Sequence, residues 1–468
     1  MLNGEAYRAS LRDGRKMYVN GESIDDVTTH RMFQRAVDNA AVDYDRYYDP
    51  TPGACAPYYL IPTTPEELRE HEELQHTWSF PTVSTVHALL MLTTAASRMR
   101  ATNPLEADRA MAYFDEARLA DIRCVQTITD AKGHRGRSPS QQDDPDLYLH
   151  VVDRQRDGIV IRGAKLHISS AAIAHDLIVM PTKRMKAGEE EWAVACAVPV
   201  NAEGVRVINT SFAPREDIDP RYYPYSRTNV MSEGFIVFDD VFVPNDRVFL
   251  DGVVEHSATF AHSLGLWERL GSVRHYVDIA DTLVGLAQLI SEANGTDRIA
   301  HVKDKIGEMV VYASLIRGCY EAAISTAGRT PEGWMSPDEV FTNSAKYYAA
   351  SEFSKMIRHL HDISGGSVLT APTLADLDNP ETGDYLAKYM RTMPGVDAGY
   401  RMRLFHAIRD YTADAFGGWQ QVTTLQGGGG LYAQQIVARK NYDMDRAKQM
   451  ARACAGVTAD GEVLPASA

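Results

Sequence analysis

A short basic loop carries the clearest chemistry in the sequence. Residues 132–137 read KGHRGR, and their lysine, histidine and arginine side chains could donate hydrogen bonds to a phosphate or to an electron-rich ring edge. By composition alone, the same loop could be a solvated surface turn. The pattern therefore indicates a possible anion- or ring-binding loop without identifying the ligand.

Two other segments could approach a ligand closely. Ser169 and Ser170 follow the run GAKLHI, where hydroxyl and backbone N–H groups could bond a heterocycle edge, although a turn role is the simpler interpretation. The run QGGGG at residues 426–430 permits close backbone approach, because glycine lacks Cβ and accepts positive φ. A turn between two helices fits it equally. The stretch GGSVLTAP at residues 365–372 is interpreted as structural, a helix end followed by a turn.

These segments must be positioned by three units of different pattern. Residues 1–142 predict an N-terminal helical domain, in which VHALLMLTTAASRM is apolar on nearly every side and indicates a buried helix. Residues 143–254 contain short β-rich runs, with an Asp157-Gly158 hairpin signal, and predict a central β-barrel or sandwich domain. Residues 255–468 return to helical periodicity and predict a C-terminal helical bundle of four long helices.

Composition excludes several classes of protein. The 468 residues exceed the roughly 250–300 that one core supports, and the net charge of -15 disfavours a nucleic-acid partner. The five cysteines are widely spaced and form no C-x-x-C pair, so neither a disulfide framework nor a zinc site is indicated. The sequence shows no signal-peptide core and no run of about 20 apolar residues, so we expect a cytoplasmic protein with no membrane partner.

Three stretches carry a family resemblance. They are TDAKGHRGRSPSQQDDPDLYLHVVDRQRDGIVIRGAKLHISSAAIAHDLIVMPT, GFIVFDDVFVPNDRVF and GGWQQVTTLQGGGGLYAQQ. With the helical, β and helical order, they resemble the flavin-dependent 4-hydroxyphenylacetate 3-hydroxylase and 4-hydroxybutyryl-CoA dehydratase family over nearly the whole chain. The resemblance implies an α+β, acyl-CoA-dehydrogenase-like fold, FAD as cofactor, and a homo-oligomer, with a tetramer favoured.

The resemblance also implies a set of site residues. The expected cofactor-binding residues are Gln126, Thr127, Ile128, Lys132, Gly133, His134, Arg135, Ser169, Ser170, Gln426, Gly427, Gly428, Gly429 and Gly430. The catalytic candidates are His87, Arg98, Gln126, Ser169, His275 and Tyr276. A near-neutral pKa would suit His87 for proton transfer, although His87, His275 and Tyr276 could each be structural.

The sequence departs from both branches of the family. Dehydratases hold an iron–sulfur cluster with three cysteines and one histidine, yet residues 75–90 contain no cysteine, and residues 267–285 offer only His275 and Tyr276. Thr423 or Thr424 stands where a dehydratase has an acidic residue. The arginine, tyrosine and histidine with which the hydroxylases hold a phenol correspond to residues 81–85 and Gln126. We therefore expect no metal, and no phenolate clamp is evident.

The leading functional hypothesis is a two-component monooxygenase. Reduced FAD from a separate flavin reductase would react with oxygen to give a C4a-hydroperoxide that oxygenates a small organic substrate, aromatic or from specialised metabolism. No G-x-G-x-x-G fingerprint follows a strand, which is consistent with a partner reductase. One alternative is a cluster-free flavoenzyme that isomerises, dehydrates or oxidises an acyl-CoA thioester. The other is a catalytically silent homologue that acts as an assembly subunit.

Overall fold

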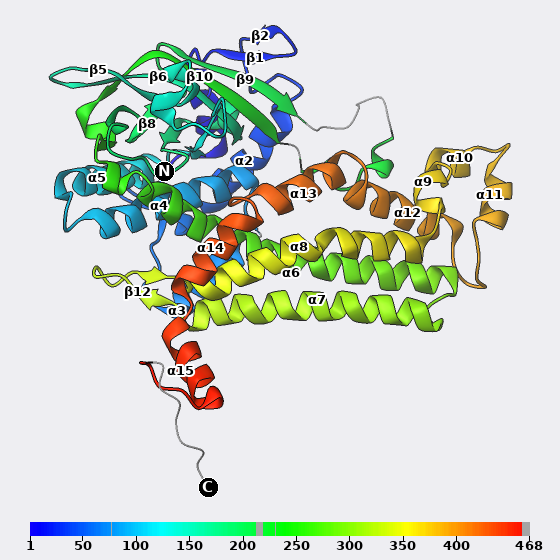
Figure 1. Ribbon diagram of the computed structural model, residues 1–468. Helices are drawn as coiled ribbons and strands as arrows, with labels where there is room; N and C mark the ends of the chain where they lie inside the picture. Colours follow the sequence, from blue (N-terminus) through cyan, green and yellow to red (C-terminus); the bar gives the residue numbers. More distant parts are fainter. Residues whose placement is uncertain (76, 212–218, 230, 461–468) are drawn as a thin grey trace.

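Two β-sheets lie above a layer of helices and a long helical bundle in the computed structural model (Figure 1). The structure describes residues 1–75, 77–211, 219–229 and 231–460. The chain passes from the helical layer into the sheets and then into the bundle, in the order that the sequence periodicity predicts.

The N-terminal part combines helices with short strands. Its elements are α1 (Gly4–Ser10), β1 (Met17–Val19), β2 (Glu22–Ile24), α2 (Gln34–Tyr47), α3 (Pro65–Gln75), α4 (Phe80–Met99), α5 (Pro104–Ala120), β3 (Cys124–Thr127) and β4 (Thr129–Asp130). Helix α4 is buried along nearly its whole length, as its apolar sequence predicts. It begins with Pro81 in its first turn, where the missing N–H of proline costs no helical hydrogen bond.

The central strands form two sheets, in which β6 and β10 alternate buried and more exposed residues while β7 and β8 are buried along nearly their whole length. They are β5 (His150–Arg154), β6 (Gly158–Ser169), β7 (Asp176–Val179), β8 (Val194–Pro199), β9 (Val205–Ser211), β10 (Ser232–Pro244) and β11 (Val248–Asp251). One sheet has the order β2-β1-β9-β10-β6-β4, with β5 also paired to β6, and the other has the order β11-β8-β7-β3.

The hairpin predicted at Asp157-Gly158 is confirmed, because β5 pairs antiparallel with β6 and Arg154 faces Ile159. Strands β1 to β4 precede residue 143 and yet join the two sheets. The domain boundaries at 142/143 and 254/255 stay predictions.

The C-terminal part is helical apart from one small hairpin. Its elements are α6 (Thr259–Asn294), α7 (Ala300–Ser325), β12 (Gly328–Arg329), β13 (Met335–Ser336), α8 (Glu339–Ser364), α9 (Ser367–Thr370), α10 (Leu374–Asp378), α11 (Gly383–Tyr389), α12 (Ala398–Thr412), α13 (Ala415–Gln426), α14 (Leu431–Asn441) and α15 (Met444–Ala455). Helices α6, α7 and α8 run side by side, and α13 crosses back toward the sheets (Figure 1). Their buried side chains share one apolar core with α4 and α5.

Candidate functional site

A buried carboxylate fixes the beginning of α4. Asp43 Oδ2 accepts hydrogen bonds from the backbone N–H of Ser79 at 2.7 Å, from Ser79 Oγ at 2.6 Å and from Thr82 Oγ1 at 2.6 Å. One turn later, Thr85 Oγ1 donates to the carbonyl of Cys124 at 3.0 Å, which ties α4 to β3. These contacts set the register of α4 against β3, and so place the next side chains of both elements opposite one another.

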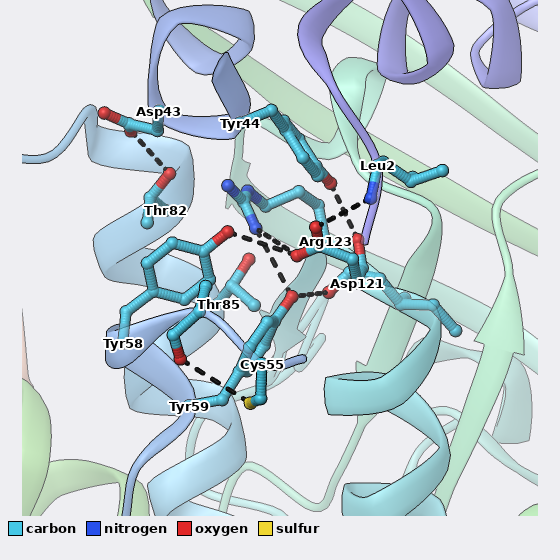
Figure 2. A network of polar contacts seen from close by, with 12 residues as sticks. Leu2, Asp43, Tyr44, Cys55, Tyr58, Tyr59, Thr82, Thr85, Asp121 and Arg123 are labelled. Carbon is cyan, nitrogen blue, oxygen red and sulfur yellow. Dashed lines mark hydrogen bonds and ion pairs between the residues drawn. The ribbon is translucent and has the colours of Figure 1, made fainter. Parts of the chain in front are cut away.

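Arg123 immediately precedes β3 and is held by a buried network. Figure 2 shows its guanidinium between the rings of Tyr44 and Tyr58, whose centroids lie 4.0 and 4.8 Å from Cζ. Asp121 Oδ1 is 3.8 Å from Arg123 Nη1, and both side chains are almost fully buried. Cation–π contact and the ion pair compensate for removing this charge from water. These contacts fix the position at which β3 begins.

Gln126 is the point at which α4, β3 and α6 meet. Ser84 Oγ of α4 donates to Gln126 Oε1 at 2.7 Å, and Gln126 Nε2 donates to Glu268 Oε1 of α6 at 2.8 Å. Strand β3 pairs with β7 on one side and lies at the edge of the described four-stranded sheet. An edge strand presents backbone N–H and C=O groups that no neighbouring strand uses.

The side of α6 on which Glu268 contacts Gln126 carries a row of polar side chains. Glu268, Ser272 and His275 are spaced by four and three residues, so they lie on one helix face. Burial raises the pKa of Glu268 and lowers the pKa of His275, although His275 is exposed to solvent at its surface.

Helix α13 closes this region through Thr424. Its carbonyl accepts hydrogen bonds from Tyr276 Oη at 3.2 Å and from Lys346 Nζ of α8. Burial lowers the pKa of Lys346 to about 7 and raises that of Tyr276. Thr424, which stands in the segment where a dehydratase has an acidic residue, thus acts here through its backbone.

Helix α13 also reaches the β-sheet. Ser169 Oγ, at the end of β6, donates to both carboxylate oxygens of Glu233 on β10, at 3.0 and 2.8 Å. Trp419 of α13 hydrogen-bonds to the same carboxylate, whose pKa is raised by burial. The Trp419 ring meets Phe80 at the beginning of α4 edge to face, with centroids 6.4 Å apart. Trp419 therefore connects the Ser169 end of the sheet to α4.

The glycine run is an ordered turn between α13 and α14. Gly428 and Gly429 have φ of 65° and 87°, the left-handed region that favours glycine. Arg269 Nε of α6 donates to the Gly428 carbonyl at 2.8 Å, and its Nη1 donates to Asn343 at 2.8 Å. Arg269, the residue after Glu268, thus holds this turn close to α6.

The basic loop at residues 132–137 also has a defined conformation. Gln142 Oε1 accepts from the N–H of His134 at 2.9 Å, and a Cβ on Gly133 would lie 2.5 Å from that oxygen. Lys132 has φ of 71°, and its backbone N–H donates to Leu147. Within the described ranges, no salt bridge forms on Lys132 or Arg135, so both remain available to an anion.

The structure brings only some of the expected residues together. Gln126 is hydrogen-bonded to Glu268, and Tyr276 separately to the Thr424 carbonyl. Ser169 shares the Glu233 carboxylate with Trp419, and Gly428 is held by Arg269, the neighbour of Glu268. Thr127 ends β3 and Ile128 lies between β3 and β4, while Ser170 turns out of β6 with φ of 62°. The cofactor-binding roles of all these residues stay predictions.

Arg98 lies outside this network, contrary to expectation. It is 14 residues beyond Ser84 on α4, a helical rise of about 21 Å. Its guanidinium pairs with Glu339 at 2.9 Å and donates to Ser263 at 3.2 Å. Arg98 therefore joins α4 to α8 and α6 at the other end of the helix.

His87 lies next to the site but is not free to titrate near neutrality. Its Nε2 is 3.2 Å from Gln75 Oε1, and a Cβ on Gly271 would lie 2.5 Å from the same nitrogen. Burial lowers the pKa of His87 to about 3. His87 therefore lacks the near-neutral pKa that would suit proton transfer, because close packing of α3, α4 and α6 removes the ring from water.

His87 should make the fold sensitive to acid. A histidine whose folded pKa is lowered contributes stability above its unfolded pKa of 6.5, and this contribution is lost as the pH falls toward 3. From pH 7 to pH 5, urea unfolding of His87→Gln should lose about 2 kcal/mol less stability than the wild type. The matched variant His301→Gln, at an exposed position on α7, should behave as the wild type. Equal losses for His87→Gln and wild type would contradict this assignment.

Several site residues escaped prediction from the sequence. They are Ser84, Glu233, Glu268, Arg269, Lys346 and Trp419. Only Glu268 had a usable signal, since it is a charged residue within an apolar helix and lies seven residues before His275 on the same face. Among the described residues, no group of three or more His, Cys, Asp or Glu side chains could hold a metal ion.

Solved structures with this fold define the class of protein. An oxygen-tolerant archaeal 4-hydroxybutyryl-CoA dehydratase from N. maritimus matches with a TM-score of 0.85 and 26% identity, over 100% of this chain and 97% of that chain. The oxygenase component of 4-hydroxyphenylacetate 3-monooxygenase complexed with FAD matches with a TM-score of 0.85 and 25% identity, over 97% and 98%. These matches confirm the predicted α+β, acyl-CoA-dehydrogenase-like fold class.

Sequence comparison then identifies the family. The model for the 4-hydroxyphenylacetate 3-hydroxylase N-terminal region matches residues 3–250, and that for the C-terminal region matches residues 257–456. The chain belongs to the 4-hydroxyphenylacetate 3-hydroxylase family. It is 28% identical to a 4-hydroxyphenylacetate 3-monooxygenase oxygenase component of Geobacillus sp. (strain PA-9), over 89% of each chain. It is 26% identical to 4-hydroxybutyryl-CoA dehydratase/vinylacetyl-CoA-Delta-isomerase of Clostridium aminobutyricum, over 98% of this chain and 100% of that protein.

Proposed function

We propose that the chain is the oxygenase component of a flavin-dependent monooxygenase that uses reduced FAD and oxygen. The relatives named as oxygenase components and the solved complex with FAD support this proposal. When bound, reduced flavin supplies the activation of oxygen and its transfer to the substrate. The protein supplies a desolvated recess, hydrogen bonds to the flavin edge and a positioned substrate.

The residues present fit a flavin. The free edge of β3 at Gln126 offers backbone donors and acceptors to a pyrimidine edge, and Lys132 and Arg135 can pair with phosphate. Gly428 and Gly429 have no side chain of their own, so the backbone of this turn can approach a ligand closely. These three segments would hold the cofactor, and Ser169 would hydrogen-bond beside it.

One observation favours oxygenase over dehydratase chemistry. The side chains of α4 and α6 that meet at Gln126 are Ser84 and Glu268. Protein iron–sulfur clusters are held mainly by cysteine thiolates, whereas a carboxyl and a hydroxyl suit a pocket that hydrogen-bonds an organic substrate. We propose a small organic substrate, aromatic in view of Phe80 and Trp419 at the edge of the site.

Rapid mixing tests this function. Protein mixed anaerobically with reduced FAD and then with oxygen should show a transient flavin absorbance before oxidised FAD appears, unlike free reduced FAD. Flavin binding without this transient would contradict oxygenase chemistry and favour the acyl-CoA thioester alternative, which the dehydratase relative supports. Failure to bind any flavin would favour a silent assembly subunit.

The remaining partners follow from the same proposal. A separate flavin reductase would supply reduced FAD, as the name "oxygenase component" of the relatives suggests. We also propose a cytoplasmic homo-oligomer, with a tetramer favoured. None of the helices that the structure describes has the length and apolar character needed to cross a membrane.

A further inference from the structure

We propose that Glu268 anchors the substrate and selects a molecule that presents an O–H or N–H hydrogen-bond donor. This inference rests on the function proposed above and specifies the substrate class of that site. Glu268 lies on α6, and the protein holds its carboxyl group by a hydrogen bond to only one of the two oxygens.

The two carboxylate oxygens of Glu268 differ in their contacts. Oε1 accepts a hydrogen bond from Gln126 Nε2 at 2.8 Å. Oε2 accepts no hydrogen bond from any residue that the structure describes, and the side chain is only half-buried. Oε2 is not among the described buried atoms that lack a partner, so a donor from outside the protein can reach it. A substrate donor at this position would supply a hydrogen bond to it.

Gln126 orients this carboxyl group. Its Oε1 accepts from Ser84 Oγ at 2.7 Å, which leaves Nε2 pointing to Glu268. Both ends of the amide are therefore engaged within the protein. In this arrangement Gln126 is a positioning residue, and Glu268 is the group that meets the substrate.

The nearby cations are directed elsewhere. Arg269 donates to the Gly428 carbonyl and to Asn343, and Lys346 donates to the Thr424 carbonyl. Both charges lower the pKa of Glu268, while the larger effect of burial raises it. Above its pKa the carboxylate accepts hydrogen bonds. An anionic substrate would meet this carboxylate without a free cation to pair with, so a neutral donor is selected.

Phenol binding tests the proposal directly. The FAD-loaded protein is titrated with 4-nitrophenol at pH values on both sides of the probe's own pKa, where absorbance distinguishes phenol from phenolate. The wild type should bind the neutral phenol, and its affinity should fall as the phenolate forms. 4-Nitroanisole, which lacks the O–H, should bind at least about tenfold more weakly, equivalent to about 1.4 kcal/mol.

Variants assign the effect to Glu268. Glu268→Gln offers an amide that both donates and accepts, so its preference for neutral phenol should vanish and its affinity for phenol should fall about tenfold. Glu268→Asp should restore part of the preference. Glu292→Gln, at an exposed position on the same helix, is the matched control and should behave as the wild type.

Three outcomes would overturn the proposal: preferential binding of phenolate by the wild type, no binding of 4-nitrophenol, or an unchanged pH profile in Glu268→Gln. Flavin fluorescence on the same samples separates this result from the proposed function. If the wild type holds no FAD, the oxygenase proposal fails, while the same titration of the flavin-free chain still decides the role of Glu268.

Discussion

Lys165→Met should lower the free energy of unfolding by about 3–5 kcal/mol, because it leaves a buried carboxylate without its counter-charge. Lys165 Nζ lies 2.7 Å from Asp130 Oδ1, and the two side chains are 1% and 2% exposed. The ammonium also donates to the carbonyls of Ile128 at 2.9 Å and Met180 at 2.8 Å. Methionine matches the length of the stem but satisfies none of these acceptors. Urea unfolding followed by circular dichroism at pH 7 measures the loss.

A surface ion pair provides the control for this prediction. Lys355 pairs with Glu308 at 2.6 Å between side chains that are 40% and 51% exposed, and Lys355→Met should cost no more than about 1 kcal/mol. Combining Lys165→Met with Asp130→Asn should recover part of the loss, because the unpaired charge is then removed as well. A cost for Lys165→Met no larger than that of Lys355→Met would show that this buried pair does not support the fold.

Gly428→Val should weaken FAD binding by at least about tenfold, equivalent to about 1.4 kcal/mol. Gly428 has φ of 65°, which a β-branched residue rarely adopts, and a Cβ there would lie 3.1 Å from Arg269 Cγ. The added side chain would displace either the turn or the arginine that holds it to α6. Quenching of FAD fluorescence measures the affinity.

The matched variant for this test is Gly418→Val on α13. A Cβ at Gly418 meets no heavy atom within 4 Å, so this variant should keep wild-type flavin affinity. Thermal unfolding of both variants separates a local change in the turn from loss of the fold. Wild-type flavin affinity in Gly428→Val would mean that residues 427–430 do not approach the cofactor.

Local periodicity in the sequence determines the elements and their order. The continuous apolar run of α4, the alternating residues of β6 and β10 and the hairpin at Asp157-Gly158 each encode their structure within a few residues. Such patterns predict the fold class, because helix and strand place side chains at fixed and different intervals. Motifs that are contiguous in the chain, such as the basic loop and the glycine turn, could be found in the same way.

Only the tertiary structure decides which side chains meet. Ser84, Gln126 and Glu268 are far apart in the chain and come together because α4, β3 and α6 pack against one another. Lys346 of α8 meets Thr424 of α13 in the same way. No sequence interval encodes such contacts. Packing also fixes the electrostatics: desolvation lowers the pKa of His87 and raises that of Glu268 by amounts that depend on the surrounding atoms. The sequence by itself therefore determined the scaffold and its contiguous loops, while the acid at the centre of the site was decided by the way the helices pack against the edge of a sheet.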